Sequence, residues 1–272
     1  MGVPLFDRVA VLTVGQIRVE RLRIAFNVTK TAKPEPNKAS IKVYNLSEEH
    51  RGYLSELSAS GVDTQLEAGY RAGTSIIYRG SLQRVFTMRD KADLVTTLET
   101  ADGVKQVQQS RVSISVQKGA TNKDVLAKVA RAVGVSDGNL PDALAKLGGA
   151  SVFLNGGVFF GSAADEMTRL CRSLDLTWSI QDGKLQVLAR GAAVEGVAIR
   201  LSKDSGLINE PSIDPKGKLQ GSMLIQPDVF PGRLVKLEGE RVKGNFKLDQ
   251  TVHQGDTRAT TPWAVNFQAE AF

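Results

Sequence analysis

Apolar and polar residues alternate with a period of two along much of the first hundred residues. This spacing is typical of β-strands, in which successive side chains point to opposite faces of a sheet. It predicts short strands rich in β-branched and aromatic residues at 8–14, 17–28, 40–44, 65–70, 75–78, 85–88 and 93–101. Glycines interrupt the runs where turns would be needed, at Gly15, Gly69, Gly73 and Gly80.

Two other segments of this part do not follow the strand pattern. Residues 32–38 carry two prolines among charged residues, which predicts an extended loop because proline is excluded from helix interiors and central strands. An amphipathic run from Ser47 to Leu57, with two glutamates in its first turn, predicts one helix that ends near Gly61. A many-stranded unit with one small helix suggests a barrel or a sandwich.

The period changes to that of a helix in the middle of the chain. A strand at 113–116 precedes a helix that runs to Gly134, and a second helix begins near Gly161 and runs to Asp175. Both starts show the spacing S/T-x-x-D of a capping box, with Thr121 and Asp124 in the first and Ser162 and Asp165 in the second. Each helix has one apolar face, so the pattern predicts two β-α units.

Strand patterns return after the second helix. The dipeptide Asp182-Gly183 between alternating segments at 176–180 and 185–189 predicts a β-hairpin. The rest of the chain predicts strands at 222–225, 234–237, 244–251 and 263–271, with turns at Pro227, Gly239 and the pairs Pro231-Gly232 and Gly255-Asp256. The pattern therefore predicts a β-rich α+β protein with a strand-rich domain at residues 1–108, an α+β domain at 109–191 and a second strand-rich domain at 192–272.

Composition supports a folded globular protein and argues against several other classes. The chain has 272 residues, of which 42% are hydrophobic and 24% charged, which allows two or three compact units. The net charge is +6, but the cations are spread along the chain and form no cluster for binding phosphates. The longest uncharged stretch, 147–164, contains several glycines, so no membrane span is expected.

The N-terminus and the single cysteine indicate where in the cell the protein is made and kept. Asp7 and Arg8 lie where a signal peptide would need an apolar core, so we expect a protein made and kept in a cytoplasm. Cys171 cannot form an intramolecular disulfide, and its apolar neighbours predict a buried core residue.

Residues that could perform catalysis or bind a metal are scarce. The two histidines, His50 and His253, lie far apart, and no zinc, nucleophile-elbow or phosphate-loop motif is present. We therefore expect no enzyme activity, no cofactor and no metal, although a pair of carboxylates for glycoside hydrolysis remains an alternative because sequence does not give their separation. Phe159, Phe160, Trp178 and Trp263 could stack on sugars, but aromatic residues in β-rich domains more often fill cores or interfaces between subunits.

Three stretches of the sequence form distinctive motifs. They are P-N-K-A-S-I-K-V-Y-N-L-S from Pro36, the two helix-containing segments of the middle domain, and the C-terminal G-S-M-L-I-Q-P-D-V-F-P-G followed by T-V-H-Q-G-D and Trp263. In this order they resemble baseplate hub proteins of contractile phage tails, of the late-control protein D type. In this family Tyr44, Asn45 and Leu46 fall in the first motif, with Tyr44, Leu46 and Trp263 as anchors. Pro231-Gly232 and Gly255-Asp256 are expected to form turns, and His253 to stabilise a turn by a hydrogen bond.

The resemblance implies two β-barrel domains, one from each end of the chain, that flank the α+β domain. Three subunits would form a ring of six barrels in the virion baseplate, joining the sixfold tail tube or its tube-initiator protein to the threefold central spike. Other baseplate proteins would be further partners. DNA would pass through the lumen without sequence-specific binding, and assembly would occur in the host cytoplasm.

Two other functions stay open at this point. One is a tail-tip or tube-initiator protein of a non-contractile tail, or the hub of a related injection device. The other is a peptidoglycan-binding or peptidoglycan-cleaving module, because helix-containing domains of this size can resemble wall-binding repeats.

Overall fold

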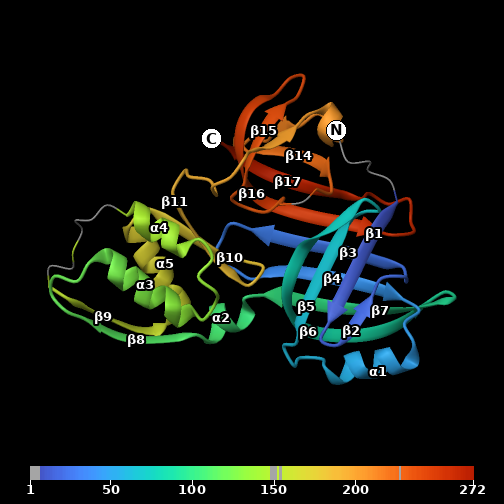
Figure 1. Ribbon diagram of the computed structural model, residues 1–272, viewed down its shortest axis with the longest axis horizontal. Helices are drawn as coiled ribbons and strands as arrows, with labels where there is room; N and C mark the ends of the chain where they lie inside the picture. The colour runs from blue at the N-terminus through green and yellow to red at the C-terminus, as the bar shows by residue number, and fades with distance from the viewer. Residues whose placement is uncertain (1–6, 148–151, 153–154, 227) are drawn as a thin grey trace. The chain divides into compact units, whose positions relative to one another are not determined.

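The computed structural model describes residues 7–147, 152, 155–226 and 228–272 (Figure 1). The turn expected at Pro227 lies outside them. The chain divides into two compact units, one formed by residues 1–31, 37–102 and 194–272 and the other by residues 32–36 and 103–193. The first unit therefore combines both ends of the chain.

The N-terminal part of the first unit consists of strands and one helix. These elements are β1 (Arg8–Val14), β2 (Ile17–Val19), β3 (Ile24–Thr31), β4 (Asn37–Tyr44), α1 (Glu48–Glu56), β5 (Asp63–Tyr70), β6 (Gly73–Asp90) and β7 (Asp93–Asp102). Ser47 caps α1 as expected, since its side chain accepts a hydrogen bond from the His50 amide. The helix ends at Glu56, earlier than the expected end near Gly61.

The C-terminal part of the first unit adds six strands and a short 3₁₀ helix. They are β12 (Ile199–Leu201), η1 (Lys203–Ser205), β13 (Ser212–Ile213), β14 (Leu219–Leu224), β15 (Leu234–Glu238), β16 (Lys243–Asp256) and β17 (Ala264–Ala271). The strand predicted at 244–251 is longer in the structure because the alternation of buried and partly exposed residues continues to Gly255.

One sheet runs through both ends of the chain (Figure 1). Its strand order is β13-β14-β17-β16-β3-β4-β7-β6-β5-β1-β2, with β15 and β12 attached beside β16. The two ends meet where β16 pairs antiparallel with β3, from Gln250 opposite Thr31 to Asp256 opposite Ala25. A single hydrophobic core lies on one face of this sheet and includes Phe26 and Ile41 from the N-terminal part and Val265 and Phe267 from the C-terminal part.

Some strand and turn predictions in this unit are wrong. Residues 17–28 form two strands, β2 and β3, because the consecutive charged residues Glu20 and Arg21 interrupt the alternation between them. The segments 75–78 and 85–88 belong to one long strand, β6, in which Gly80 forms no turn. A Cβ atom at Gly80 would lie 2.3 Å from the Tyr78 hydroxyl, so glycine serves close packing here.

The second unit consists of small sheets and helices. Its elements are α2 (Val104–Gln109), β8 (Arg111–Val116), α3 (Asn122–Val133), α4 (Leu140–Lys146), β9 (Gly157–Ser162), α5 (Ala163–Ser173), β10 (Leu176–Gln181) and β11 (Lys184–Ala189). β8 pairs with β9, and β10 pairs with β11 in the predicted hairpin. The two β-α units, β8-α3 and β9-α5, are confirmed, whereas α2 and α4 were not predicted.

The predicted caps and apolar faces of this unit are confirmed. Thr121 accepts a hydrogen bond from the Asp124 amide at 3.1 Å, and Ser162 accepts one from the Asp165 amide at 3.2 Å. Cys171 is buried on the inner face of α5, and burial raises the pKa of its thiol to about 12.

The β-rich α+β class predicted from the sequence is confirmed. Among the described residues, the strand ladders form an open sheet and do not close into a barrel. The two flanking barrels and the boundaries at residues 108 and 191 therefore stay predictions.

Candidate functional site

Two sequence motifs from opposite ends of the chain meet at Arg23, which lies just before β3. The Arg23 guanidinium donates to both carboxylate oxygens of Asp256, at 2.8 Å from Nη2 and 3.1 Å from Nε. Its other contact is the ring of Tyr44, whose centroid lies 4.1 Å from the guanidinium carbon. Arg23 therefore joins the Tyr44 motif to the Gly255-Asp256 motif, and no motif in the sequence pointed to it.

Asp256 holds the bend that follows β16. Its Oδ1 accepts hydrogen bonds from the amides of Arg258 and Ala259, at 2.9 and 3.1 Å. Burial alone would raise the pKa of this carboxyl, but the hydrogen bonds from Arg23 and the two amides outweigh it, so the pKa is lowered from its ordinary value. The expected turn at Gly255-Asp256 is wrong, because these residues end β16 and the bend begins at Thr257.

Trp263 anchors the other side of this bend. Its ring is 4% exposed and packs edge-on against Phe26 of β3, with a centroid distance of 5.3 Å. A Cβ atom at Gly255 would lie 2.4 Å from the Trp263 ring, so only glycine fits beneath it. Arg8 of β1 lies over the same ring and donates to the carbonyls of Ala259 and Thr261, at 2.9 and 2.7 Å. We call Arg8, Arg23, Tyr44, Gly255, Asp256 and Trp263 the terminal clasp.

Asn45 and Leu46 continue the first motif away from the clasp. Asn45 has a φ of +57° and bridges to the start of β7, where its side chain donates to Asp93 at 2.8 Å and accepts from the Leu94 amide at 2.9 Å. Leu46 is buried in the core. Asn45 therefore fixes the end of β4 against the start of β7.

His253 and the pair Pro231-Gly232 lie outside the clasp. His253 is a buried residue within β16, and its ring hydrogen-bonds the backbone of Val229. Burial, with the positive charge of Lys30, lowers its pKa to about 3. Phe230, Pro231, Gly232 and Arg233 form a turn in which the Arg233 amide donates to the Phe230 carbonyl and Gly232 has a φ of +94°, as a type II turn requires. The turn predicted at Pro231-Gly232 is confirmed.

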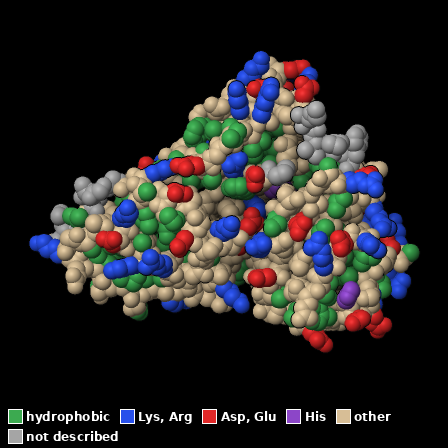
Figure 2. All heavy atoms as spheres, in the orientation of Figure 1, with side chains coloured by type: hydrophobic (Ala, Val, Ile, Leu, Met, Phe, Trp, Pro, Cys, Tyr) green, Lys and Arg blue, Asp and Glu red, His purple; other side chains and the backbone are tan. Residues whose placement is uncertain are grey.

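The described residues contain no cluster of metal ligands. Within them, no group of three or more His, Cys, Asp or Glu residues could hold a metal ion, and no helix is long and apolar enough to cross a membrane. Trp178, Trp263 and Phe159 are buried, as expected for core residues, whereas Phe160 is exposed. Cations and carboxylates are interspersed on the face shown in Figure 2.

The sheet face opposite the core is rich in uncharged polar groups. Side chains from β14, β17, β16 and β3 lie in three rows across the strands, and none of them is charged. We call this surface the amide face; its residues are Gln220, Gln268, Gln250 and Thr31, then Ser222, Asn266, Val252 and Thr29, then Leu224, Ala264, Gln254 and Asn27.

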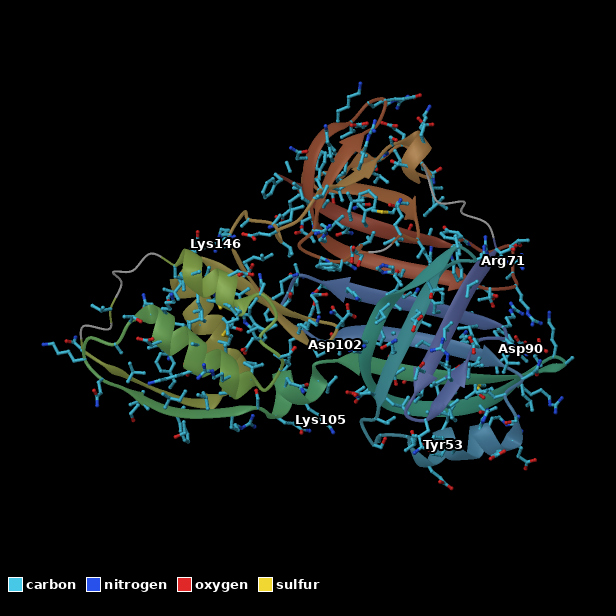
Figure 3. All side chains as sticks on the ribbon, in the orientation of Figure 1. Tyr53, Arg71, Asp90, Asp102, Lys105 and Lys146 are labelled. Atoms are coloured by element: carbon cyan, nitrogen blue, oxygen red, sulfur yellow. The ribbon has the colours of Figure 1, made fainter. Side chains whose placement is uncertain are left out.

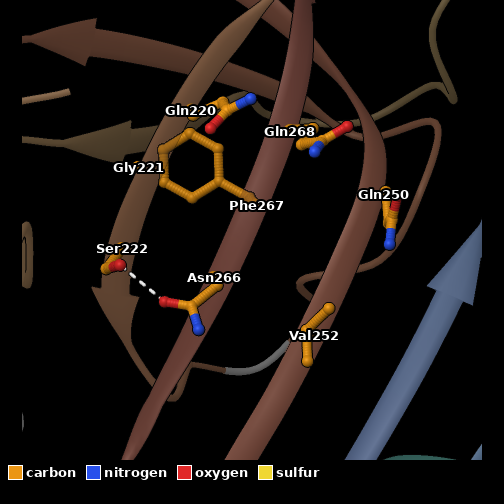
Figure 4. A pocket seen from close by; sticks show the side chains of 8 residues that line it. All are labelled: Gln220, Gly221, Ser222, Gln250, Val252, Asn266, Phe267 and Gln268. Atoms are coloured by element: carbon orange, nitrogen blue, oxygen red, sulfur yellow. Dashed lines mark hydrogen bonds between the residues drawn. The ribbon is translucent and has the colours of Figure 1, made fainter. Parts of the chain in front are cut away.

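Part of the amide face forms an open hollow of about 350 Å³, shown in Figure 4. The Ser222 hydroxyl donates to the Asn266 side-chain oxygen across it, at 2.5 Å. Beside the rows, Lys218 contacts Asp249 and Glu270 and Lys247 contacts Glu270, so the positive and negative charges there balance.

Residues 8–241 match the family model described as baseplate hub gp41. The chain belongs to the baseplate hub gp41 family. The matched residues include Tyr44, Asn45, Leu46 and the Pro231-Gly232 turn, and they end before His253 and the C-terminal half of the clasp. Membership makes the chain a structural component of a phage tail or a related injection device.

Solved structures of tail proteins have the same fold as this family member. The 43 kDa tail protein of prophage MuSo2 from Shewanella oneidensis is 8% identical with a TM-score of 0.67, and the match covers 97% of this chain and 98% of that protein. A tail protein from Neisseria meningitidis MC58 is 13% identical with a TM-score of 0.64, over 97% and 96% of the two chains.

A third similar structure comes from a secretion system. The E. coli c3393 protein, a component of the type VI secretion system, is 8% identical with a TM-score of 0.59, and the match covers 96% of this chain and 76% of that one. Its description records structural similarity to the T4 bacteriophage tail proteins gp27 and gp5. No curated protein sequence matches the chain significantly.

Proposed function

We propose that three copies of this chain form a ring that joins the tail tube to the central spike of the baseplate. Each copy would contribute two barrel-like halves, one from each end of the chain, so that the ring has six similar parts. Such a ring would match a threefold spike to a sixfold tube, and a closed heterologous contact can provide this symmetry. DNA would pass through the ring, and the protein would act without catalysis.

The observation that carries this proposal is the continuous sheet with its amide face. The pairing of β16 with β3 places strands from both halves side by side in one surface. An uncharged polar face gives neither the phosphate attraction of a cationic surface nor the repulsion of an anionic one. A surface of this kind suits a channel through which DNA slides, so we assign the amide face to the lumen, where β4 continues the rows with Lys38, Ser40 and Lys42.

The size of the sheet agrees with such a channel. The sheet order from β13 to β6 contains eight strands, counting both of these. Three copies would supply 24 strands, which at about 4.8 Å spacing and a tilt near 40° would form a ring of roughly 24 Å backbone radius. After the side chains are subtracted, this leaves room for a DNA duplex.

The native mass in solution tests the ring. We expect size exclusion with light scattering to give three times the chain mass of 29.3 kDa. A chain that stays monomeric at every concentration and also in the presence of its spike and tube partners would contradict the proposal.

Lysine substitutions test the assignment of the lumen. The triple variant Gln220→Lys, Gln250→Lys and Gln268→Lys adds nine charges to the lumen of a three-chain ring. The matched control Gln108→Lys, Gln109→Lys and Gln117→Lys adds the same charge to exposed positions of the second unit. We expect the first variant to retain DNA more strongly than the control, and we expect this retention to decrease steeply as the salt concentration rises. Equal retention by both variants would contradict the placement of the amide face in the lumen.

The similarity to a type VI secretion component favours one second candidate. In a related injection device, the same ring would join a tube to a spike without carrying a genome. Copurification with a tube protein from a gene cluster that lacks capsid proteins would distinguish this role from that of a phage baseplate.

A further inference from the structure

The far half of β6 has a free backbone edge. β5 pairs with β6 only between Gly73 and Ser81, and beyond the bulge between Leu82 and Arg84 the strand continues to Asp90 with β7 alone. Figure 3 shows Asp90 at the tip of this projecting hairpin. The Val85 amide points away from β7, since it donates to the Ser58 hydroxyl at 3.1 Å. By the alternation of an antiparallel ladder, the amides of Thr87 and Arg89 point to the same outer edge.

This edge also carries exposed apolar surface. Met88 is 63% exposed and lies on the same face of the sheet as Phe86. Among the described residues, no strand covers this part of β6. Native proteins cover or protect such edges because exposed strands pair with other chains.

The opposite end of the same sheet has a second exposed border. The segment 206–213 lies along β14, where the Ile208 amide donates to the Ser222 carbonyl at 2.9 Å and Ser212 pairs with Gln220. Ile208 and Ile213 on this segment are 43% and 57% exposed. The sheet from β13 to β6 therefore has exposed apolar side chains at both of its ends.

Inside one chain, the two halves already meet edge to edge through β16 and β3. A ring of three chains needs a second junction of similar character between the last half of one chain and the first half of the next. A closed ring with one repeated contact must be heterologous, so the two surfaces differ and each lies at one end of the sheet.

We propose that the free edge of β6 at residues 86–90 packs against the segment 206–213 of a second copy of this chain. This proposal rests on the three-chain ring and adds the contact that closes it. Met88 of one copy meets the apolar border of Ile208 and Ile213 on the next copy, and burial of these side chains favours association.

Cysteine cross-linking tests this contact cleanly. The chain has one native cysteine, Cys171, which is buried with its pKa raised to about 12 and does not compete for a maleimide. The test variant carries Met88→Cys and Ile208→Cys, and a short bismaleimide is added after the native mass and the circular dichroism spectrum are measured. The matched control carries Met88→Cys and Ile76→Cys, because Ile76 is 44% exposed but lies on the β5-β6 hairpin.

The expected result is a covalent series of two and three chains for the test variant, ending in a closed three-chain species. Each single-cysteine variant and the control should stay as single chains on a denaturing gel. A two-chain product from Met88→Cys alone would indicate a contact of like surfaces and overturn the proposal. A trimer by native mass that forms no cross-link would overturn this interface and leave the ring intact. A chain that stays monomeric at every concentration and also with its spike and tube partners would overturn both.

A charge variant gives a second measurement that does not depend on cross-linking. We expect Met88→Lys to raise the dissociation constant of the trimer at least tenfold, because the lysine would lose hydration at the contact. Ile76→Lys should leave the dissociation constant unchanged. Equal effects of the two variants would overturn the assignment.

Discussion

Removal of the Asp256 carboxylate should destabilise the first unit more than most single substitutions. The Asp256 side chain is 7% exposed and that of Arg23 is 31% exposed. Asp256→Ala leaves the guanidinium and the amides of Arg258 and Ala259 without their acceptor. Breaking a buried pair by removing one partner costs about 3–5 kcal/mol, and partial rehydration of Arg23 reduces this to roughly 2–4 kcal/mol.

Urea unfolding followed by tryptophan fluorescence measures this loss. The chain has two tryptophans, Trp178 in the second unit and Trp263 in the clasp, so a Trp178→Phe background reports on the first unit. In an Arg23→Ala background, Asp256→Ala should cost only about 1–2 kcal/mol, because the paired charge is already gone. A loss below about 1 kcal/mol, or equal losses with and without Arg23, would refute the clasp as a coupled unit.

The same carboxyl predicts a pH dependence. Its pKa in the folded protein lies below the ordinary value of 3.8, so the unfolded chain binds the proton more tightly. The stabilisation is therefore complete above the unfolded pKa and is lost as the pH falls through the folded value. Asp256→Asn should lower the free energy of unfolding at neutral pH and make its decrease at acid pH less steep. If the variant lost stability at acid pH as steeply as the wild type, the Asp256 carboxyl would not be the cause of that loss.

Three further predictions concern other residues. Gly255→Ala should cost about 1–3 kcal/mol in urea unfolding through its clash with the Trp263 ring, and Trp263→Phe in the same chain should recover part of it; no loss would contradict the close approach. His253 is buried with its pKa lowered to about 3, so wild-type stability should fall by up to about 1.4 kcal/mol per pH unit below pH 6.5, and His253→Gln should show a smaller slope. Cys171 should react with a thiol reagent only after unfolding, and rapid reaction in buffer would show that α5 opens.

The parts of the fold that could be predicted from sequence are those fixed by neighbouring residues. The hairpin at Asp182-Gly183 and the caps at Thr121 and Ser162 need only a few consecutive residues, and the structure confirms them. Gly80 shows the limit of such reasoning. Its role depends on the Tyr78 side chain and the neighbouring strand, so it forms no turn.

The clasp shows the same limit for the candidate site. Tyr44, Asp256 and Trp263 could be selected as motif residues, but their meeting point depends on the pairing of β16 with β3. Arg23 and Arg8 carry no local signal, because an isolated arginine beside a strand is usually a surface residue. Arg23 precedes the motif that begins at Pro36 by a whole strand, so its pairing with Asp256 could have been suggested only if the sheet order were already known.

The junction of β3 with β16 also has a consequence for synthesis. The partner strand of β3 begins to appear only when the ribosome has added more than two hundred further residues. At about 5–20 residues per second, the nascent chain waits roughly 10–45 seconds with β3 unpaired on that side. Premature pairing between neighbouring nascent chains on one messenger would compete with correct folding during this interval. Slower translation lengthens the interval before β16 is available and therefore does not help β3 to pair correctly. Chaperone binding near β3 during this interval would protect the yield of folded protein.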